Sequence, residues 1–109
     1  MAQVHKNLGQ SKPAATTLTD LYTVPASTSS IVSTITVCNQ SAVATAFRIS
    51  IAPAGAADAT SQYIAYDVPI AGNEVMTFTL GLSMATTDKI RVYNTLATLS
   101  FGAYGVELT

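Results

Sequence analysis

The segment TAFRISI, residues 45–51, decides the class of fold. Its apolar residues are Phe47, Ile49 and Ile51, and the polar residues between them are Arg48 and Ser50. Because successive side chains of a β-strand point to opposite faces, this period of two predicts a strand with one face toward a core. The phase places Phe47, Ile49 and Ile51 on that inner, buried face and leaves Arg48 and Ser50 exposed on the opposite face.

Similar short segments lie on both sides of this strand. Six further candidate strands span residues 21–24, 31–39, 63–68, 75–80, 90–93 and 99–106. They alternate with turn residues at intervals of about 8 to 12 residues, a spacing typical of β-sandwiches and barrels. No segment has helical periodicity over the roughly 11 residues that a helix assignment needs. We therefore predict an all-β fold, an antiparallel β-sandwich of jelly-roll or immunoglobulin-like type with about seven to eight strands.

The candidate strand at residues 31–39 has two faces of unequal polarity. The expected inner residues are Ile31, Ile35 and Val37, and the opposite face carries Val32, Thr34, Thr36 and Cys38. This second face is only weakly polar. We expect it to pack under a loop or against another subunit.

The first 20 residues follow neither structural period and include Gly9, Pro13 and a tract of small residues. We interpret residues 1–19 as an extended N-terminal arm, with room for one short strand, and residues 20–109 as the sandwich domain. Widely spaced apolar residues in the arm suit a strap that docks on a neighbouring subunit, while the alternative is a disordered tail. The expected interface residues are Val4, Leu8 and Leu18 of the arm, with Tyr22 and Tyr104 of the strands.

The composition indicates a protein that associates with other proteins. Only 10% of the 109 residues are charged, against about 25% in a typical soluble domain, and the net charge is -1. The chain has 16 Thr and 10 Ser, so hydroxyl groups solvate much of its surface. Such a surface repels its own copies weakly, so we expect a homo-oligomer. Five scattered basic residues disfavour nucleic acid, and no apolar run approaches the length of a membrane span.

The sequence offers little for catalysis. It has one histidine, His5, and one cysteine, Cys38, so a Ser/His or Cys/His site, an internal disulfide and a zinc cluster are not expected. The carboxylates are Asp20, Asp58, Asp67, Glu74, Asp88 and Glu107. Most of them fall at predicted strand ends or turns, where turn formation and solubility explain them. We predict that the protein is not an enzyme and has no catalytic residues, metal site or cofactor.

A carbohydrate-binding sandwich is the competing interpretation. Such modules stack exposed aromatic rings on sugars, but the five tyrosines lie within predicted strands and there is no tryptophan. Tyr63 and Tyr66 are three residues apart and so would point to opposite faces of a regular strand. They would share one face only if a bulge intervenes.

Several of these segments resemble a known group of proteins. The matching residues are Leu21–Ala26, Ile31–Ile35, Val37–Asn39, Phe47–Ile49, Ile51–Pro53 and Ser100–Glu107. Together they are similar to small virion proteins of tailed bacteriophages, and the similarity covers roughly residues 8–107. Its motifs are structural, so no functional residue carries over.

The resemblance implies a β-sandwich that decorates or cements the capsid, with the major capsid protein or another virion protein as its partner. The alternative is a part of the tail, baseplate or fibre, or a module that binds carbohydrate on the host surface. No apolar segment typical of a signal peptide follows Met1, so we expect assembly in the host cytoplasm and a final location in the virion.

Overall fold

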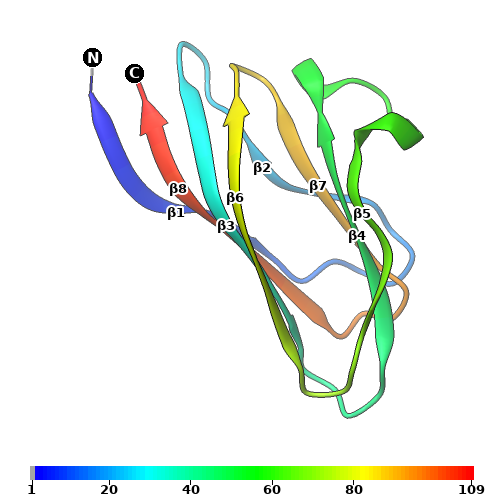
Figure 1. Cartoon of the computed structure of the whole chain (residues 1–109). Coiled ribbons are helices and arrows are strands. Elements are labelled where there is room, and N and C mark those ends of the chain that lie inside the picture. The colour runs from blue at the N-terminus through cyan, green and yellow to red at the C-terminus, as the bar shows by residue number, and fades with distance from the viewer. Residues whose placement is uncertain (1) are drawn as a thin grey trace.

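The computed structural model describes residues 2–109, which form two four-stranded antiparallel sheets packed face to face (Figure 1). The strands are β1 (Gln3–Ser11), β2 (Thr19–Thr23), β3 (Ser29–Asn39), β4 (Thr45–Ala52), β5 (Tyr63–Ile70), β6 (Val75–Met84), β7 (Lys89–Asn94) and β8 (Leu99–Leu108). Two short 3-10 turns, η1 (Pro53–Gly55) and η2 (Thr60–Gln62), lie in the β4–β5 connection. The predicted antiparallel β-sandwich of about seven to eight strands is confirmed, with eight strands, and each of the seven predicted segments forms a strand.

The strand order defines the type of sandwich. The first sheet has the order β1-β8-β3-β6, and the second has the order β2-β7-β4-β5. Thus β1 pairs with β8, β2 with β7, β3 with β6 and β4 with β5. These are the pairs of one long antiparallel ribbon that is rolled up on itself. The pair β3–β8 joins β1–β8 to β3–β6 in the first sheet, and the pair β4–β7 joins β2–β7 to β4–β5 in the second. This arrangement is a jelly roll, the first of the two types that the sequence left open.

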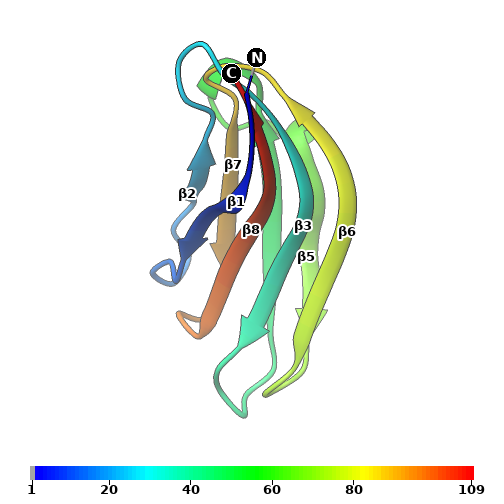
Figure 2. The ribbon, with the colours of Figure 1, turned by 90° about the vertical axis from the view of Figure 1, so that its left-hand side faces the viewer.

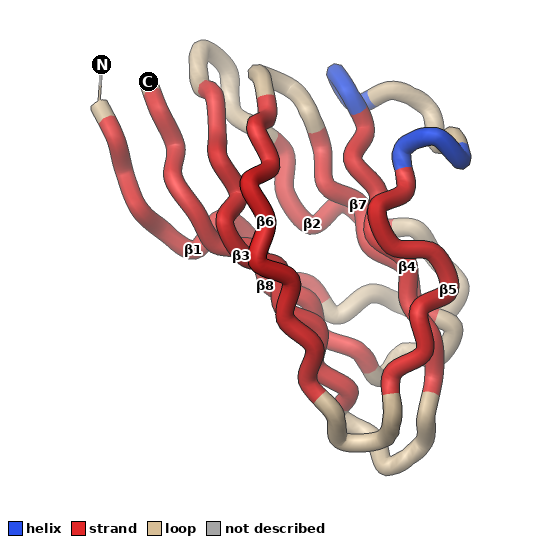
Figure 3. Tube along the Cα trace, viewed as in Figure 1, coloured by secondary structure: helices blue, strands red, loops and turns tan. Residues whose placement is uncertain are grey.

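The core lies between the sheets and is made of aliphatic side chains around three phenylalanines. Phe47 is fully buried and contacts Phe78 and Phe101 edge to face, at ring-centroid distances of 6.0 and 6.1 Å. Edge-to-face contact is a favoured geometry for aromatic pairs. The sheets diverge toward the end that carries the two termini (Figure 3).

Strand β4 has the predicted phase but not the predicted exposure. Phe47 and Ile49 are buried, and Ile51 packs against the core while partly exposed. Ser50 points to the outer face yet has no exposed surface. It lies between Tyr63 of β5 and Arg91 of β7, its partners in the register of the two neighbouring strands. The expectation that this outer position faces solvent is therefore wrong.

Strand β3 departs from the predicted alternation at one end. Ile31 is 43% exposed, whereas Val32 is fully buried, which is the reverse of the expectation. The register with both neighbouring strands shifts between Val32 and Thr34. Ser33 has no partner on β8, and this extra residue moves the preceding residues to the opposite faces. A bulge of this kind changes the face that each following side chain occupies. Beyond it, Ile35 and Val37 are buried as predicted.

The N-terminal segment is extended, as expected, but most of it belongs to the sandwich. Residues 3–11 form β1, which pairs along its length with β8 and is an edge strand of the first sheet. The register shifts between Asn7 and Gly9, and Gly9 lies close to Leu21 of β2. A side chain at Gly9 would collide with the carbonyl oxygen of Leu21, so glycine permits this close passage. The boundary at residue 20 thus does not separate an arm from the domain.

Candidate interaction surfaces

Within residues 2–109, the strands of the first sheet place no ionised side chain on its outer face. The register places the following residues on it: Gln3, His5, Asn7 and Gln10 of β1, Ser100, Gly102, Tyr104, Val106 and Leu108 of β8, Ser29, Ile31, Thr34, Thr36 and Cys38 of β3, and Val75, Thr77, Thr79 and Ser83 of β6. None of them is Asp, Glu, Lys or Arg. We call this surface the neutral face. Val75, at 61% exposure, and Ile31 are its most exposed large apolar residues.

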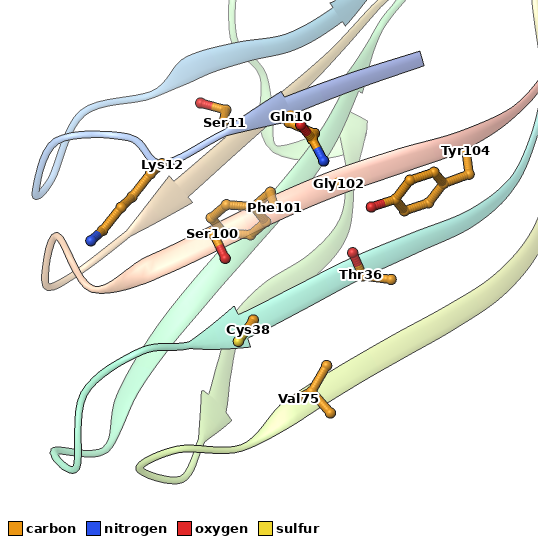
Figure 4. A pocket seen from close by; sticks show the side chains of 10 residues that line it. All are labelled: Gln10, Ser11, Lys12, Thr36, Cys38, Val75, Ser100, Phe101, Gly102 and Tyr104. Atoms are coloured by element: carbon orange, nitrogen blue, oxygen red, sulfur yellow. The ribbon is translucent and has the colours of Figure 1, made fainter. Parts of the chain in front are cut away.

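A shallow depression of about 610 Å³ lies on the neutral face, near the C-terminal end of β1 (Figure 4). Its lining residues are Gln10, Ser11, Lys12, Thr36, Cys38, Val75, Ser100, Phe101, Gly102 and Tyr104. The floor is backbone at Gly102, and the Tyr104 ring reaches back along β8 toward it. A Cβ at Gly102 would lie 2.6 Å from the Tyr104 hydroxyl oxygen, so a side chain there would displace the ring. Because Gly102 has no side chain, there is room for both the Tyr104 ring and the depression.

The outer face of the second sheet is charged and aromatic. It carries five of the eleven charged residues of the chain, namely Asp20, Arg48, Asp67, Lys89 and Arg91. Lys89 and Arg91 both bond to Asp20, with Nζ–Oδ2 and Nε–Oδ1 distances of 2.8 and 3.3 Å. These two cations, Lys89 first, lower the pKa of the Asp20 carboxyl group. The two outer faces therefore differ sharply in character.

Arg48 forms the centre of an aromatic cluster on this second face. Its guanidinium carbon lies 4.2 Å from the Tyr66 ring centroid and 4.6 Å from that of Tyr93. Its Nε donates a 2.7 Å hydrogen bond to Asp67, and this ion pair raises the pKa of Arg48. Tyr63 packs edge to face on Tyr66 at 5.1 Å. We call these residues, Arg48, Tyr63, Tyr66, Asp67 and Tyr93, the tyrosine cluster.

Bulges in β5 bring Tyr63 and Tyr66 into contact. The β4–β5 register shifts between Phe47 and Ile49 and again between Ile49 and Ser50. Asp67 has a φ of 50°, which is the left-handed region found in many bulged strands. The condition set by the sequence for a shared aromatic surface is thus met. The two rings stand at 86° to each other, so they form a corner and not one flat platform.

A buried polar network joins the two sheets near the termini. The Tyr22 hydroxyl of β2 donates a 2.6 Å hydrogen bond to Glu107 of β8 and shares another of 2.6 Å with Ser30 of β3. Lys6 of β1 forms a 2.7 Å ion pair with the second Glu107 oxygen. Burial, followed by the bond to Glu107, raises the pKa of Tyr22 to about 12. Lys6, followed by Tyr22, lowers the pKa of Glu107.

The predicted interface residues fall in different environments. Tyr22 is buried in this network and is not available to a partner, and Leu8 packs against the core. Val4 is exposed on β1, and Leu18 is half-buried before β2. Tyr104 lies on the neutral face. The sequence signal for the neutral face was the absence of charge on the outward positions, which becomes visible only when the strand register is known.

The chemistry-bearing residues do not converge. His5 and Cys38 lie on the neutral face at different ends of the register, and within residues 2–109 no group of three His, Cys, Asp or Glu residues is arranged to hold a metal ion. Asp58 accepts a hydrogen bond from Tyr63, and Asp88 accepts bonds from the backbone N–H groups of Ala54 and Ala85. Over the same residues, no helix is long and apolar enough to cross a membrane.

Comparisons with protein-family models, with curated proteins and with solved structures found no match to this chain.

Proposed function

We propose that the protein is a structural subunit of a tailed-bacteriophage virion, which decorates the capsid and cements its shell. The observation that carries the proposal is the neutral face, the outer surface of one sheet whose strands place no Asp, Glu, Lys or Arg on that side within residues 2–109. Apart from Lys12, which follows β1 and lines the depression, burying this surface against a partner leaves no charge without a counter-ion, so the penalty for desolvating ions is confined to one ammonium group. The similarity of the sequence to small phage virion proteins supports the same assignment.

The mechanism of a cement subunit is passive. Each copy would bury part of its neutral face across a joint between capsid proteins, at about 25 cal/mol per Å² of apolar area before the costs of association. The depression beside Gly102 gives the face a place where a protruding side chain of the partner can lodge. Many copies would together raise the free energy needed to rupture the shell.

Quantitative mass spectrometry of purified particles of the phage that encodes the sequence tests the location. Hundreds of copies per particle are expected for a shell subunit. A few to dozens would place the protein on the tail, and its absence from particles would overturn the proposal.

A charge on the neutral face tests the surface. Thr36 lies at the centre of the face, so Thr36→Lys should weaken attachment to particles about tenfold or more, because the new ammonium group must be desolvated. Thr95→Lys, in the exposed turn between β7 and β8, is the matched control and should bind like the wild type. Equal binding of Thr36→Lys and the wild type would move the contact away from this face.

The tyrosine cluster favours a second candidate function, a module that binds carbohydrate on the host surface. Tyr66 is 53% exposed and stands beside a guanidinium and a carboxylate, groups that bond sugar hydroxyls. A glycan array with the wild type and Tyr66→Ala tests it. A glycan signal that Tyr66→Ala abolishes would favour this function, and a blank array would leave the cluster as a structural feature of the sheet.

A further inference from the structure

We propose that β6 pairs edge to edge, in antiparallel orientation, with β6 of a second copy of this chain. Strand β6 is the last strand of the first sheet and lies at one side of the sandwich (Figure 2). It pairs only with β3, and over residues 2–109 no other hydrogen bond reaches its backbone. About half of its N–H and C=O groups therefore point away from the sheet, a ready template for another strand. This inference does not depend on the proposed virion function.

The other three edge strands carry features that discourage pairing. Strand β1 contains Lys6 and a register shift before Gly9, and β2 is only five residues long with a shift after Asp20. Strand β5 contains Pro69, which lacks an N–H, and the bulge at Asp67. Charges, prolines, bulges and short length are the usual protections of sheet edges.

Strand β6 has none of the chemical protections. Its sequence, VMTFTLGLSM, has no charged residue and no proline over ten residues. Its register with β3 shifts once, where Leu80 and Gly81 lie opposite Ser33, so β6 shares one irregularity with β1 and β2. Its side chains nevertheless alternate between outward and inward without interruption from Val75 to Met84. An uncharged, alternating edge of this length favours strand addition.

The side chains along this edge also leave apolar surface uncovered. Met76, Phe78, Leu80 and Leu82 point inward and pack against the core, but each is only partly buried. The sandwich is open on this side, since β6 and β5 are the neighbouring edges of the two sheets. A strand added to β6 would place its own inward side chains beside this row and cover more of it.

The sequence of β6 is complementary to itself. A two-fold axis perpendicular to the sheet at Thr79 would set Thr79 opposite the same residue of the second copy, and Phe78 opposite Leu80. Inward residues then meet inward residues, outward residues meet outward residues, and no like charges face each other. Because a two-fold pairing also closes the assembly at two copies, a second copy fits this edge without any further component.

Replacing Thr79 with residues of like charge, and of opposite charge in a mixture, tests this pairing. In native mass spectrometry and light scattering over a concentration series, the wild type should dimerise. Thr79→Lys should raise the dimer dissociation constant at least about fivefold, because two lysines would face each other. An equimolar mixture of Thr79→Lys and Thr79→Glu should form a heterodimer more readily than either variant forms a homodimer. Thr95→Lys is the control and should dimerise like the wild type.

Folding does not confound the test, because Thr79 is exposed on the outer face and circular dichroism verifies each variant. A wild type that stays monomeric at all concentrations would overturn the proposal, whatever its location in a particle. So would a dimer of unchanged stability in Thr79→Lys. In a Cys38→Ser background, Thr79→Cys should form a disulfide-linked dimer on mild oxidation, and failure to cross-link would contradict the register.

Discussion

Tyr22 and Glu107 lie 85 positions apart in the chain, and their side chains share a hydrogen bond of 2.6 Å that joins the two sheets. The bond lies toward the end where the sheets diverge, and Ser30 and Lys6 complete the set of partners. A buried hydroxyl and carboxylate that satisfy each other avoid the cost of unpaired polar groups. The network thus links β2 of one sheet to β3, β8 and β1 of the other.

The pKa of Tyr22 predicts a loss of stability in alkali. Its folded value of about 12 exceeds the ordinary value of 10.0, so the neutral hydroxyl contributes stability that is complete below pH 10 and is lost as the pH rises toward 12. Tyr22→Phe should lower the free energy of unfolding by about 1–3 kcal/mol at neutral pH and remove this alkaline component. Urea denaturation at a series of pH values measures both effects. Tyr104→Phe, outside the network, is the control and should keep the alkaline loss of stability. If Tyr22→Phe also kept this loss, its assignment to the Tyr22 hydroxyl would be wrong.

The pKa of Glu107 predicts an effect of opposite sign in acid. The folded pKa lies below the ordinary value of 4.5, so the ionised carboxylate contributes stability above that pH, which is lost as the pH falls through the lowered value. Lys6 is 44% exposed, so water screens the ion pair and the contribution is about 1 kcal/mol or less. Glu107→Gln should therefore flatten the decline of the melting temperature in acid. Glu74→Gln, in the β5–β6 turn, should leave most of the decline in place, and equal profiles for the two variants would refute the role of Glu107.

Adjacent positions of β4 should respond differently to substitution. Ile49 faces the core, so Ile49→Asp buries an unpaired carboxylate and should prevent folding. Ser50 is also buried, but its hydroxyl has no hydrogen-bond partner in the described part of the chain. Ser50→Ala removes that unsatisfied group and should leave the free energy of unfolding unchanged or raise it by up to about 1 kcal/mol. Thermal unfolding of both variants checks the pair, and a large loss in Ser50→Ala would show that the hydroxyl is satisfied in solution.

The strands were predictable from the sequence because alternation is a local signal. Residues 45–51 show their phase without any knowledge of neighbours, and the structure places Phe47 and Ile49 in the core accordingly. The reversal at Ile31 and Val32 was not predictable, because the extra residue Ser33 is defined only by the strands on either side. The burial of Ser50 was likewise not predictable, because the residues on either side of it in the sheet, Tyr63 and Arg91, are distant in sequence.

The surfaces were harder to predict than the strands. The low charge content was visible in the composition. The placement of the charged residues away from the outward positions of one sheet follows only from the pairing of β1, β8, β3 and β6. The contact between Tyr63 and Tyr66 required bulges that the sequence named only as a condition. The pairing of β1 was missed because its apolar residues, Val4 and Leu8, follow no regular period, and the register shift between Asn7 and Gly9 explains why.

Removal of β1 should destabilise the whole sandwich. Deletion of residues 2–11 exposes the edge of β8, removes Leu8 from the side of the core and leaves Glu107 without Lys6. The lost β-ladder, apolar contacts and ion pair act together, so the melting temperature should fall by several degrees or more. A strap that orders only on a partner would instead leave the melting temperature unchanged when deleted.

Within the full chain, Leu8→Ala should be more destabilising than Val4→Ala, because Leu8 packs on the core whereas Val4 is exposed. Equal melting temperatures for the full chain, the deletion and Leu8→Ala would show that β1 contributes nothing to the fold in solution and would restore the interpretation of residues 1–19 as an arm.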